Sequence, residues 1–149
     1  MDLSSINKVY FIGIGGIGMS ALANYFLQKN IPVYGYDREG SVITENLKNL
    51  GSNIIHNYND FNITEFKSDI NSTLVIYTPA LSKEHPLLTK FREDEFKVFK
   101  RAEVLQKISV NSKCIAVAGT HGKTTTSAIL AHILKVSDLK FSAFVGGIM

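Results

Sequence analysis

The stretch Lys8-Val9-Tyr10-Phe11-Ile12-Gly13-Ile14-Gly15-Gly16-Ile17-Gly18 decides the fold. Its first half is a continuous apolar run, which is typical of a strand buried on both faces of a parallel sheet. Its second half has the pattern G-x-G-x-x-G, which between a strand and a helix predicts a turn that cradles a nucleotide diphosphate. The first glycine permits the tight turn, the second lets the backbone approach the diphosphate, and the third lets the helix pack closely on the sheet. A glycine turn needed only for packing is the alternative for this loop.

Strand and helix patterns alternate along the chain up to about residue 100. Apolar residues recur at helical spacing after the loop, and Asn30 with Pro32 predicts the end of that helix. Ser41 predicts the N-cap of a second helix and Gly51 its end, while Pro86 predicts the start of another helix. Further strands are predicted at residues 33–36, 54–55, 74–77 and 98–99. This alternation predicts an α/β fold with a Rossmann-like, doubly wound parallel sheet.

A second glycine loop, Ala118-Gly119-Thr120-His121-Gly122-Lys123-Thr124-Thr125-Thr126, follows an apolar run and precedes a predicted helix at about residues 123–136. This order predicts phosphate binding, because backbone N–H groups and the helix N-terminus point at the anion. Lys123 would place its ammonium on the β- and γ-phosphates, and the Thr124 hydroxyl would bind Mg²⁺. The common P-loop has its first glycine where this chain has Val117, and simple turn chemistry is the alternative. Two such loops suggest a reaction that joins two substrates.

The pattern of elements changes near residue 100, where a helix is predicted without a glycine turn before it. A polar connector follows, and residues 113–118 predict a strand that opens the second loop's unit. We therefore divide the chain into a Rossmann-like domain at residues 1–99, a linker helix and connector at 100–112, and the incomplete start of a P-loop domain at 113–149. This last unit is too short to bury a core, so the chain is expected to end inside it. Its apolar end, residues 141–149, is expected to self-associate.

Polar residues follow the predicted strands at the sheet edge where open parallel sheets bind ligands. Asp37 comes where dinucleotide-binding folds place an acid on the ribose, and a turn or helix cap is the alternative. His56 ends the third strand and either touches ligand or is satisfied locally. Thr78-Pro79-Ala80 ends the fourth strand, where Pro79 simply stopping the strand is the alternative. His132 lies among apolar residues of the last helix and is expected to be structural.

Composition limits the remaining classes of protein. Hydrophobic residues make up 45% and charged residues 19% of the chain, which describes a folded globular protein. The net charge of +3 is modest and its Lys and Arg residues are dispersed, so it argues only weakly for nucleic acid, and we expect no nucleic-acid partner. No signal peptide is visible, and no apolar run approaches the roughly 20 residues that a membrane span needs. The single cysteine, Cys114, is expected to be a buried, inert thiol and fits a reducing cytoplasm.

Taken together, these motifs resemble the Mur ligase family over all 149 residues. The resemblance rests on the first loop with its flanks, residues 10–21, and on the second loop, residues 116–126. Gly35-Tyr36-Asp37, residues 75–80 and Lys100-Arg101-Ala102-Glu103-Val104-Leu105 follow in family order. The P-loop that lacks its first glycine is typical of this family, so the departure at Val117 supports the resemblance.

The resemblance implies a bacterial cytoplasmic enzyme that joins L-alanine to UDP-N-acetylmuramate with ATP and Mg²⁺, through an acyl phosphate. Its first domain would bind the UDP-sugar instead of NAD, through Gly15, Gly16, Ile17, Gly18, Met19, Ser20, Asp37, His56, Thr78 and Ala80. Its ATP-binding residues would be Gly119, Thr120, His121, Gly122, Lys123, Thr124 and Thr125, with Lys123 and Thr124 as catalytic groups. The remainder of such a ligase is absent from these residues, so the chain alone is expected to bind the UDP-sugar without turnover.

Three alternatives remain open from the sequence. The first is another member of the family, the ligase that recycles murein tripeptide, although its opening loop departs from Gly-Ile-Gly-Gly-Ile-Gly-Met. The second is an NAD-binding dehydrogenase or regulatory nucleotide-sensing domain, which Asp37 permits but which leaves the second loop without a role. The third is a non-catalytic UDP-sugar-binding module.

Overall fold

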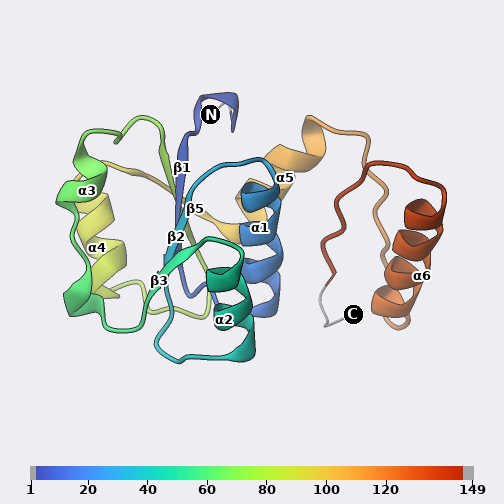
Figure 1. Cartoon of the computed structure of the whole chain (residues 1–149), viewed down its shortest axis with the longest axis horizontal. Coiled ribbons are helices and arrows are strands. Elements are labelled where there is room, and N and C mark those ends of the chain that lie inside the picture. The colour runs from blue at the N-terminus through green and yellow to red at the C-terminus, as the bar shows by residue number, and fades with distance from the viewer. Residues whose placement is uncertain (1–2, 146–149) are drawn as a thin grey trace.

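A single parallel sheet organises the first two thirds of the chain in the computed structural model, which describes residues 3–145 (Figure 1). Five strands lie in the order β3-β2-β1-β4-β5. Their bounds are β1 Lys8–Ile12, β2 Val33–Tyr36, β3 Asn53–Ile55, β4 Thr73–Tyr77 and β5 Lys97–Lys100. Each neighbouring pair is parallel, with Phe11 of β1 opposite Gly35 of β2 and Ile76 of β4. The predicted α/β fold with a doubly wound sheet is confirmed.

Helices cover both faces of the sheet (Figure 1). One face carries α1 Ile17–Gln28, α2 Val42–Asn49 and α5 Arg101–Val110, and the other carries α3 Thr64–Lys67 and α4 Pro86–Glu93. Two short 3-10 turns lie at Leu3–Ser5 and Tyr58–Asp60. Alternate residues of β1 serve the two cores, because successive strand side chains point to opposite faces. Phe11 is buried under α1, whereas Tyr10 is buried in an aromatic cluster under α3 and α4.

Local signals in the sequence place the ends of the helices as predicted. Asn30 adopts a left-handed backbone just after α1, with φ 58°, and Gly51 does so after α2, with φ 98°. Ser41 caps α2: its hydroxyl accepts the N–H of Thr44 at 3.2 Å, and the Thr44 hydroxyl accepts the N–H of Ser41 at 2.8 Å. Pro86 is the first residue of α4. Each signal satisfies or removes a backbone group that a helix end leaves unpaired.

The order of the strands creates a switch point beside β1. The chain leaves β1 to one side toward β2 and β3, then crosses to the other side to form β4 and β5. The connections that follow β1 and β4 therefore lead to opposite faces of the sheet, where α1 and α4 pack. Ligands of open α/β sheets bind at the carboxyl ends of the strands at such a switch point.

The chain after α5 departs from the sequence prediction. Residues 113–119 form no strand, and Cys114 is exposed instead of buried. A strand needs a neighbouring strand for its hydrogen bonds, and no strand within residues 3–145 lies beside this segment. Helix α6, Lys123–Val136, forms as predicted but buries no side chain, and His132 is exposed, so its expected structural role is not supported.

The segment after α6 returns to the first helix (Figure 1). Phe144 packs beside Tyr25 of α1, with the ring centroids 5.6 Å apart, whereas Phe141 stays 39% exposed. The last part of the apolar end that we expect to self-associate, residues 146–149, lies outside the described residues. Within residues 3–145, no helix combines the length and apolar character that a membrane crossing requires.

Candidate functional site

The carboxyl ends of the five strands bring the candidate residues of the first domain to one edge of the sheet. Gly13 follows β1, Asp37 follows β2, His56 follows β3 and Thr78 follows β4. Arg101 follows β5 as the first residue of α5. All strands are parallel, so residues that are far apart in the sequence share this edge. Arg101 belongs to the motif at residues 100–105, and the sequence alone assigns it no role.

The first glycine loop lies at the switch point between β1 and β4. Gly13 has a left-handed backbone, with φ 84°, which an L side chain rarely adopts. A Cβ built on Gly13 would lie 2.7 Å from the Thr78 methyl group. The loop after β1 and the start of the connection after β4 therefore touch, and both predicted segments lie side by side at the carboxyl ends of the strands.

Two groups of hydrogen bonds fix the path of this loop. The N–H groups of Gly13 and Ile14 donate to the Tyr36 carbonyl at 2.7 and 3.1 Å. The N–H of Gly15 donates to Oδ2 of Asp37 at 2.7 Å. A Cβ on Gly15 would lie 2.8 Å from the same oxygen, so the second glycine leaves room for this carboxylate. The end of β2 therefore holds the loop that follows β1.

Three successive N–H groups at the start of α1 have no acceptor among the residues that the structure describes, so they are available to a ligand. Met19 and Ser20 donate to the Gly16 carbonyl, each at 2.9 Å. By contrast, the N–H groups of Gly16, Ile17 and Gly18 meet no acceptor anywhere in residues 3–145. They lie at the positive end of the helix dipole, where backbone donors bind phosphate groups. This part of the loop is therefore suited to a diphosphate.

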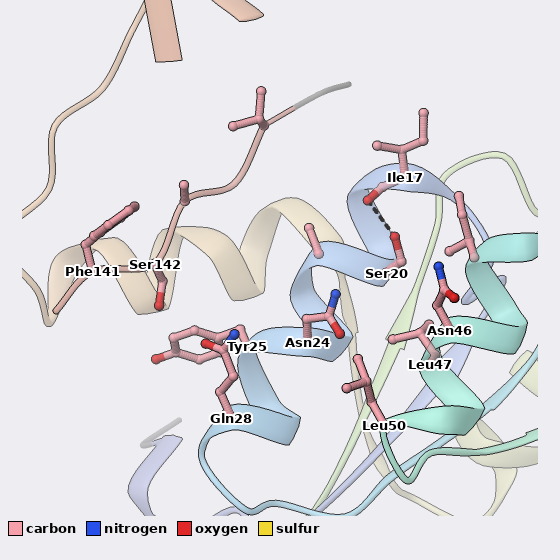
Figure 2. Close-up of a pocket in the computed structure, with 14 residues that line it drawn as sticks. Ile17, Ser20, Asn24, Tyr25, Gln28, Asn46, Leu47, Leu50, Phe141 and Ser142 are labelled. Carbon is pink, nitrogen blue, oxygen red and sulfur yellow. Dashed lines mark hydrogen bonds between the residues drawn. The ribbon is translucent and has the colours of Figure 1, made fainter. Parts of the chain in front are cut away.

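The other predicted residues of α1 contribute less through their side chains. Met19 is buried in the core under α1, and the Ser20 hydroxyl donates to the Ile17 carbonyl at 2.9 Å. A groove of about 390 Å³ lies between α1, α2 and the segment 141–145. In Figure 2, Ile17 and Ser20 lie at one end of this groove. The structure therefore separates Met19, whose side chain faces the core, from its neighbours at the surface.

Asp37 and His56 form a connected network at the end of β2. The second carboxylate oxygen of Asp37, Oδ1, accepts the N–H of Glu39 at 3.2 Å. His56 Nδ1 lies 2.9 Å from the Asp37 carbonyl oxygen, and Nε2 lies 3.1 Å from Lys48 Nζ. A carbonyl only accepts and an ammonium only donates, so this arrangement assigns the proton to Nδ1. His56 is thus satisfied within the protein, and it supports the segment that holds Asp37.

His85 is a candidate that the sequence analysis missed. Its ring lies against Tyr36 with the centroids 5.4 Å apart, just before α4. Its Nδ1 is buried and has no hydrogen-bond partner within the described part of the chain. Burial lowers the pKa of this imidazole below its usual value. The sequence shows only a histidine before a proline, which gives no signal of this position near the end of β2.

The second glycine loop also has the geometry of an anion site. Gly122 has φ 77° and precedes α6, and the Lys123 ammonium folds back to donate to the carbonyls of Gly119 and Thr120. The N–H groups of Lys123, Thr124 and Thr125 meet no acceptor in residues 3–145. All seven residues predicted for this loop, 119–125, are exposed. The loop therefore offers a lysine, a helix N-terminus and free N–H groups to solvent.

The fit of a magnesium ion at this loop rests on one side chain. The exposed Thr124 hydroxyl lies in the first turn of α6 beside the free N–H groups. Mg²⁺ in nucleotide sites takes one or two protein ligands and completes its shell with phosphate oxygens and water. Among the residues that the structure describes, no group of three His, Cys, Asp or Glu side chains gathers to hold a metal. Thr124 fits as a ligand of a nucleotide-bound ion and does not fit a cage built from protein alone.

Known proteins match this chain in sequence and in structure. The model of the Mur ligase family, catalytic domain, matches residues 8–113. UDP-N-acetylmuramate–L-alanine ligase from Parabacteroides distasonis is 50% identical over 100% of this chain and 32% of its own length. The same-named protein from Flavobacterium psychrophilum is 51% identical over 100% of this chain and 33% of its own. The chain thus spans about a third of the length of these curated relatives.

Two solved structures share the fold of the chain. The crystal structure of UDP-N-acetylmuramate–alanine ligase from Thermotoga maritima matches with a TM-score of 0.81 and 36% identity, over 95% of this chain and 32% of that one. A murein peptide ligase from Psychrobacter arcticus matches with a TM-score of 0.73 and 26% identity, over 87% of this chain and 26% of that one.

The buried imidazole of His85 predicts a pH dependence of stability. Its pKa is lowered in the folded chain, so the unfolded state binds more protons below about pH 6.5. The free energy of unfolding is therefore expected to fall as the pH drops below about 6.5. Above this pH, the histidine is neutral in both states and causes no loss of stability. Urea unfolding between pH 5 and pH 8, run on the wild type and His85→Gln, measures this. His132→Gln, on exposed α6, is the control and should keep the wild-type slope; an equal slope in His85→Gln contradicts the assignment.

The bond from Gly15 to Asp37 predicts a local loosening when the carboxylate is removed. Asp37→Ala should speed amide hydrogen exchange at Gly15 by about 10- to 150-fold, since a hydrogen bond to a charged group contributes about 1.5–3 kcal/mol. Exchange measured by NMR at each loop residue tests this. Asp60→Ala removes an exposed carboxylate elsewhere and should leave Gly15 unchanged. Unchanged exchange in Asp37→Ala would show that the loop holds its path without this carboxylate.

Proposed function

The chain belongs to the Mur ligase family, and from this premise we propose that it forms part of a UDP-N-acetylmuramate–L-alanine ligase and binds the UDP-sugar. The single observation that carries the proposal is the row of N–H groups at Gly16, Ile17 and Gly18 that find no acceptor in the described part of the chain. They lie at the sheet edge where open α/β folds bind ligands, and they suit a diphosphate. The two relatives described above are both named as this ligase, and each matches the whole length of this chain.

The remaining residues of the proposed UDP-sugar site act around this diphosphate. Gly15 and Ser20 border the free N–H groups, and Asp37 and His56 set the path of the loop through their hydrogen bonds. Thr78 contacts Gly13, and the Ala80 N–H donates to the Thr78 hydroxyl at 3.4 Å. We assign Thr78 and Ala80 to the uridine and sugar. Met19 contributes to this site only through the packing that holds α1 in place.

The second loop would bind the ATP that drives a ligation in two steps. The carboxylate of the muramoyl group attacks the γ-phosphate, which forms an acyl phosphate and releases ADP. The amine of L-alanine then attacks the acyl carbon, loses its proton, and displaces inorganic phosphate as the amide bond forms. Lys123 and the free N–H groups of residues 123–125 would stabilise the charge on the transferring phosphoryl group. Thr124 would hold Mg²⁺ together with the phosphates, and this ion neutralises phosphate charge when bound.

The alternatives receive less support. Both Asp37 oxygens already accept backbone N–H groups, which favours a role in holding the loop over a role on the ribose of NAD. The murein peptide ligase that we compared has the lower TM-score and identity of the two solved structures, 0.73 and 26% against 0.81 and 36%. A non-catalytic module agrees with our expectation for the isolated chain, because about two thirds of the relatives' length is not covered.

Calorimetric titration with UDP-N-acetylmuramate, with NADH as a parallel titrant, tests the proposed ligand of the first loop. We expect heat from the UDP-sugar and none from NADH. Binding of NADH alone would replace the proposal by a dinucleotide-binding function. Binding of neither would contradict the proposal that this chain holds the UDP-sugar by itself.

A lysine substitution tests the second loop. Lys123→Ala should lower the affinity for ATP by about tenfold or more, because it removes a charged donor from the phosphates. Its melting temperature should stay within about 3 °C of the wild type, since Lys123 is exposed and bonds only to its own loop. Lys135→Ala, in the last turn of α6, is the matched control and should leave both quantities unchanged. A large fall in melting temperature of Lys123→Ala would mean that the residue is structural.

A further inference from the structure

Arg101 crosses the first turn of α1 at Gly18. A Cβ built on Gly18 would lie 2.7 Å from Arg101 Cζ and 3.4 Å from Cδ, and it would overlap Nη1. Gly18 has no left-handed backbone angle, so its conformation does not require glycine. The sequence pattern predicts that the third glycine lets the helix approach the sheet. In this chain the space beside Gly18 is filled by the guanidinium of Arg101 instead.

The guanidinium of Arg101 has no partner for its charge within residues 3–145. No hydrogen bond, ion pair or ring contact involves this side chain there, although it is half-buried. The acid nearest to it along α5, Glu103, uses Oε2 to accept the N–H of Lys100 at 2.6 Å. An arginine held against a helix and left unpaired retains its five N–H donors for a ligand.

We propose that Arg101 binds the diphosphate of the nucleotide held at the start of α1, and that Gly18 is needed to leave room for this arginine. The proposal rests on the proposed function, because it uses the same loop. The guanidinium lies against Gly18, whose own N–H is one of the three free donors. Arginine binds phosphate with two parallel hydrogen bonds, so it complements backbone donors that carry no full charge.

This arrangement brings groups from the central strand and from an edge strand of the sheet to one ligand. The loop comes from the end of β1, whereas Arg101 comes from the end of β5, on the far side of β4. Helices α1 and α5 contact each other on the same face of the sheet, which brings the arginine within reach of the loop. A diphosphate bound there would therefore receive backbone N–H groups from the start of α1 and the Arg101 guanidinium from the start of α5.

Three variants, compared with the wild type, test the proposal with UDP as the probe. Titrations of the 149-residue chain are run at several salt concentrations for the wild type, Arg101→Ala, Gly18→Ala and the double variant. Arg101→Ala should weaken UDP binding by about 10- to 100-fold and reduce the dependence of affinity on salt, because it removes one charged donor. Gly18→Ala should weaken binding by a similar factor, since its methyl group displaces the guanidinium. The double variant should be no weaker than Arg101→Ala alone, because both substitutions remove the same contact.

The controls separate charge, folding and the proposed function. Lys107→Ala removes one positive charge from the other end of α5 and should bind UDP as the wild type does. Arg101→Lys keeps the charge without the planar pair of donors and should recover part of the affinity. If the wild type binds UDP and Arg101→Ala binds within twofold of it, Arg101 is not a ligand and only this inference fails. If the wild type does not bind UDP, both this inference and the proposed function fail.

Discussion

The register of β1 between β2 and β4 is the constraint on which the site depends. Phe11 is paired with Gly35 on one side and with Ile76 on the other, so the ends of all three strands are fixed together. This register alone brings the residues that follow the strands together: Gly13 touches Thr78, and the Gly15 N–H donates to Asp37. A slip of one residue in this register would turn the core residues of β1 to the opposite faces. The burial of Phe11 and Tyr10 in two separate cores therefore secures the geometry of the loop.

Most of the sheet and its helices could be predicted because their signals are local. The apolar run of β1 needs both faces covered, Ser41 has a partner three residues away, and Gly51 takes a left-handed backbone where α2 ends. The position of Asp37 could also be predicted, since parallel strands align their ends. The hydrogen bond from Gly15 to Asp37 could not be predicted, because the distance between the loops after β1 and β2 depends on how α1 and α2 pack against the sheet.

The failures come from contacts that the sequence pattern does not contain. The apolar run around Cys114 was predicted as a strand, but a strand requires a neighbour, and none lies beside it in residues 3–145. His85 was missed because its position against Tyr36 depends on the path of the connection after β4. The third glycine of the first loop was assigned to helix packing, because the general pattern could not show that Arg101 reaches it from the end of β5, two strands away on the same face of the sheet.

The packing of α5 bears on where the first domain ends. We predicted a linker helix and connector at residues 100–112 because no glycine turn precedes that helix. Yet Val104 and Ile108 are buried in the same core as Phe11, and α5 contacts α1, β4 and β5. A helix that only linked two domains would not need to bury these side chains. If Arg101 also binds the ligand of the first loop, α5 takes part in both the core and the site, and the first domain is better counted through Val110 than to residue 99.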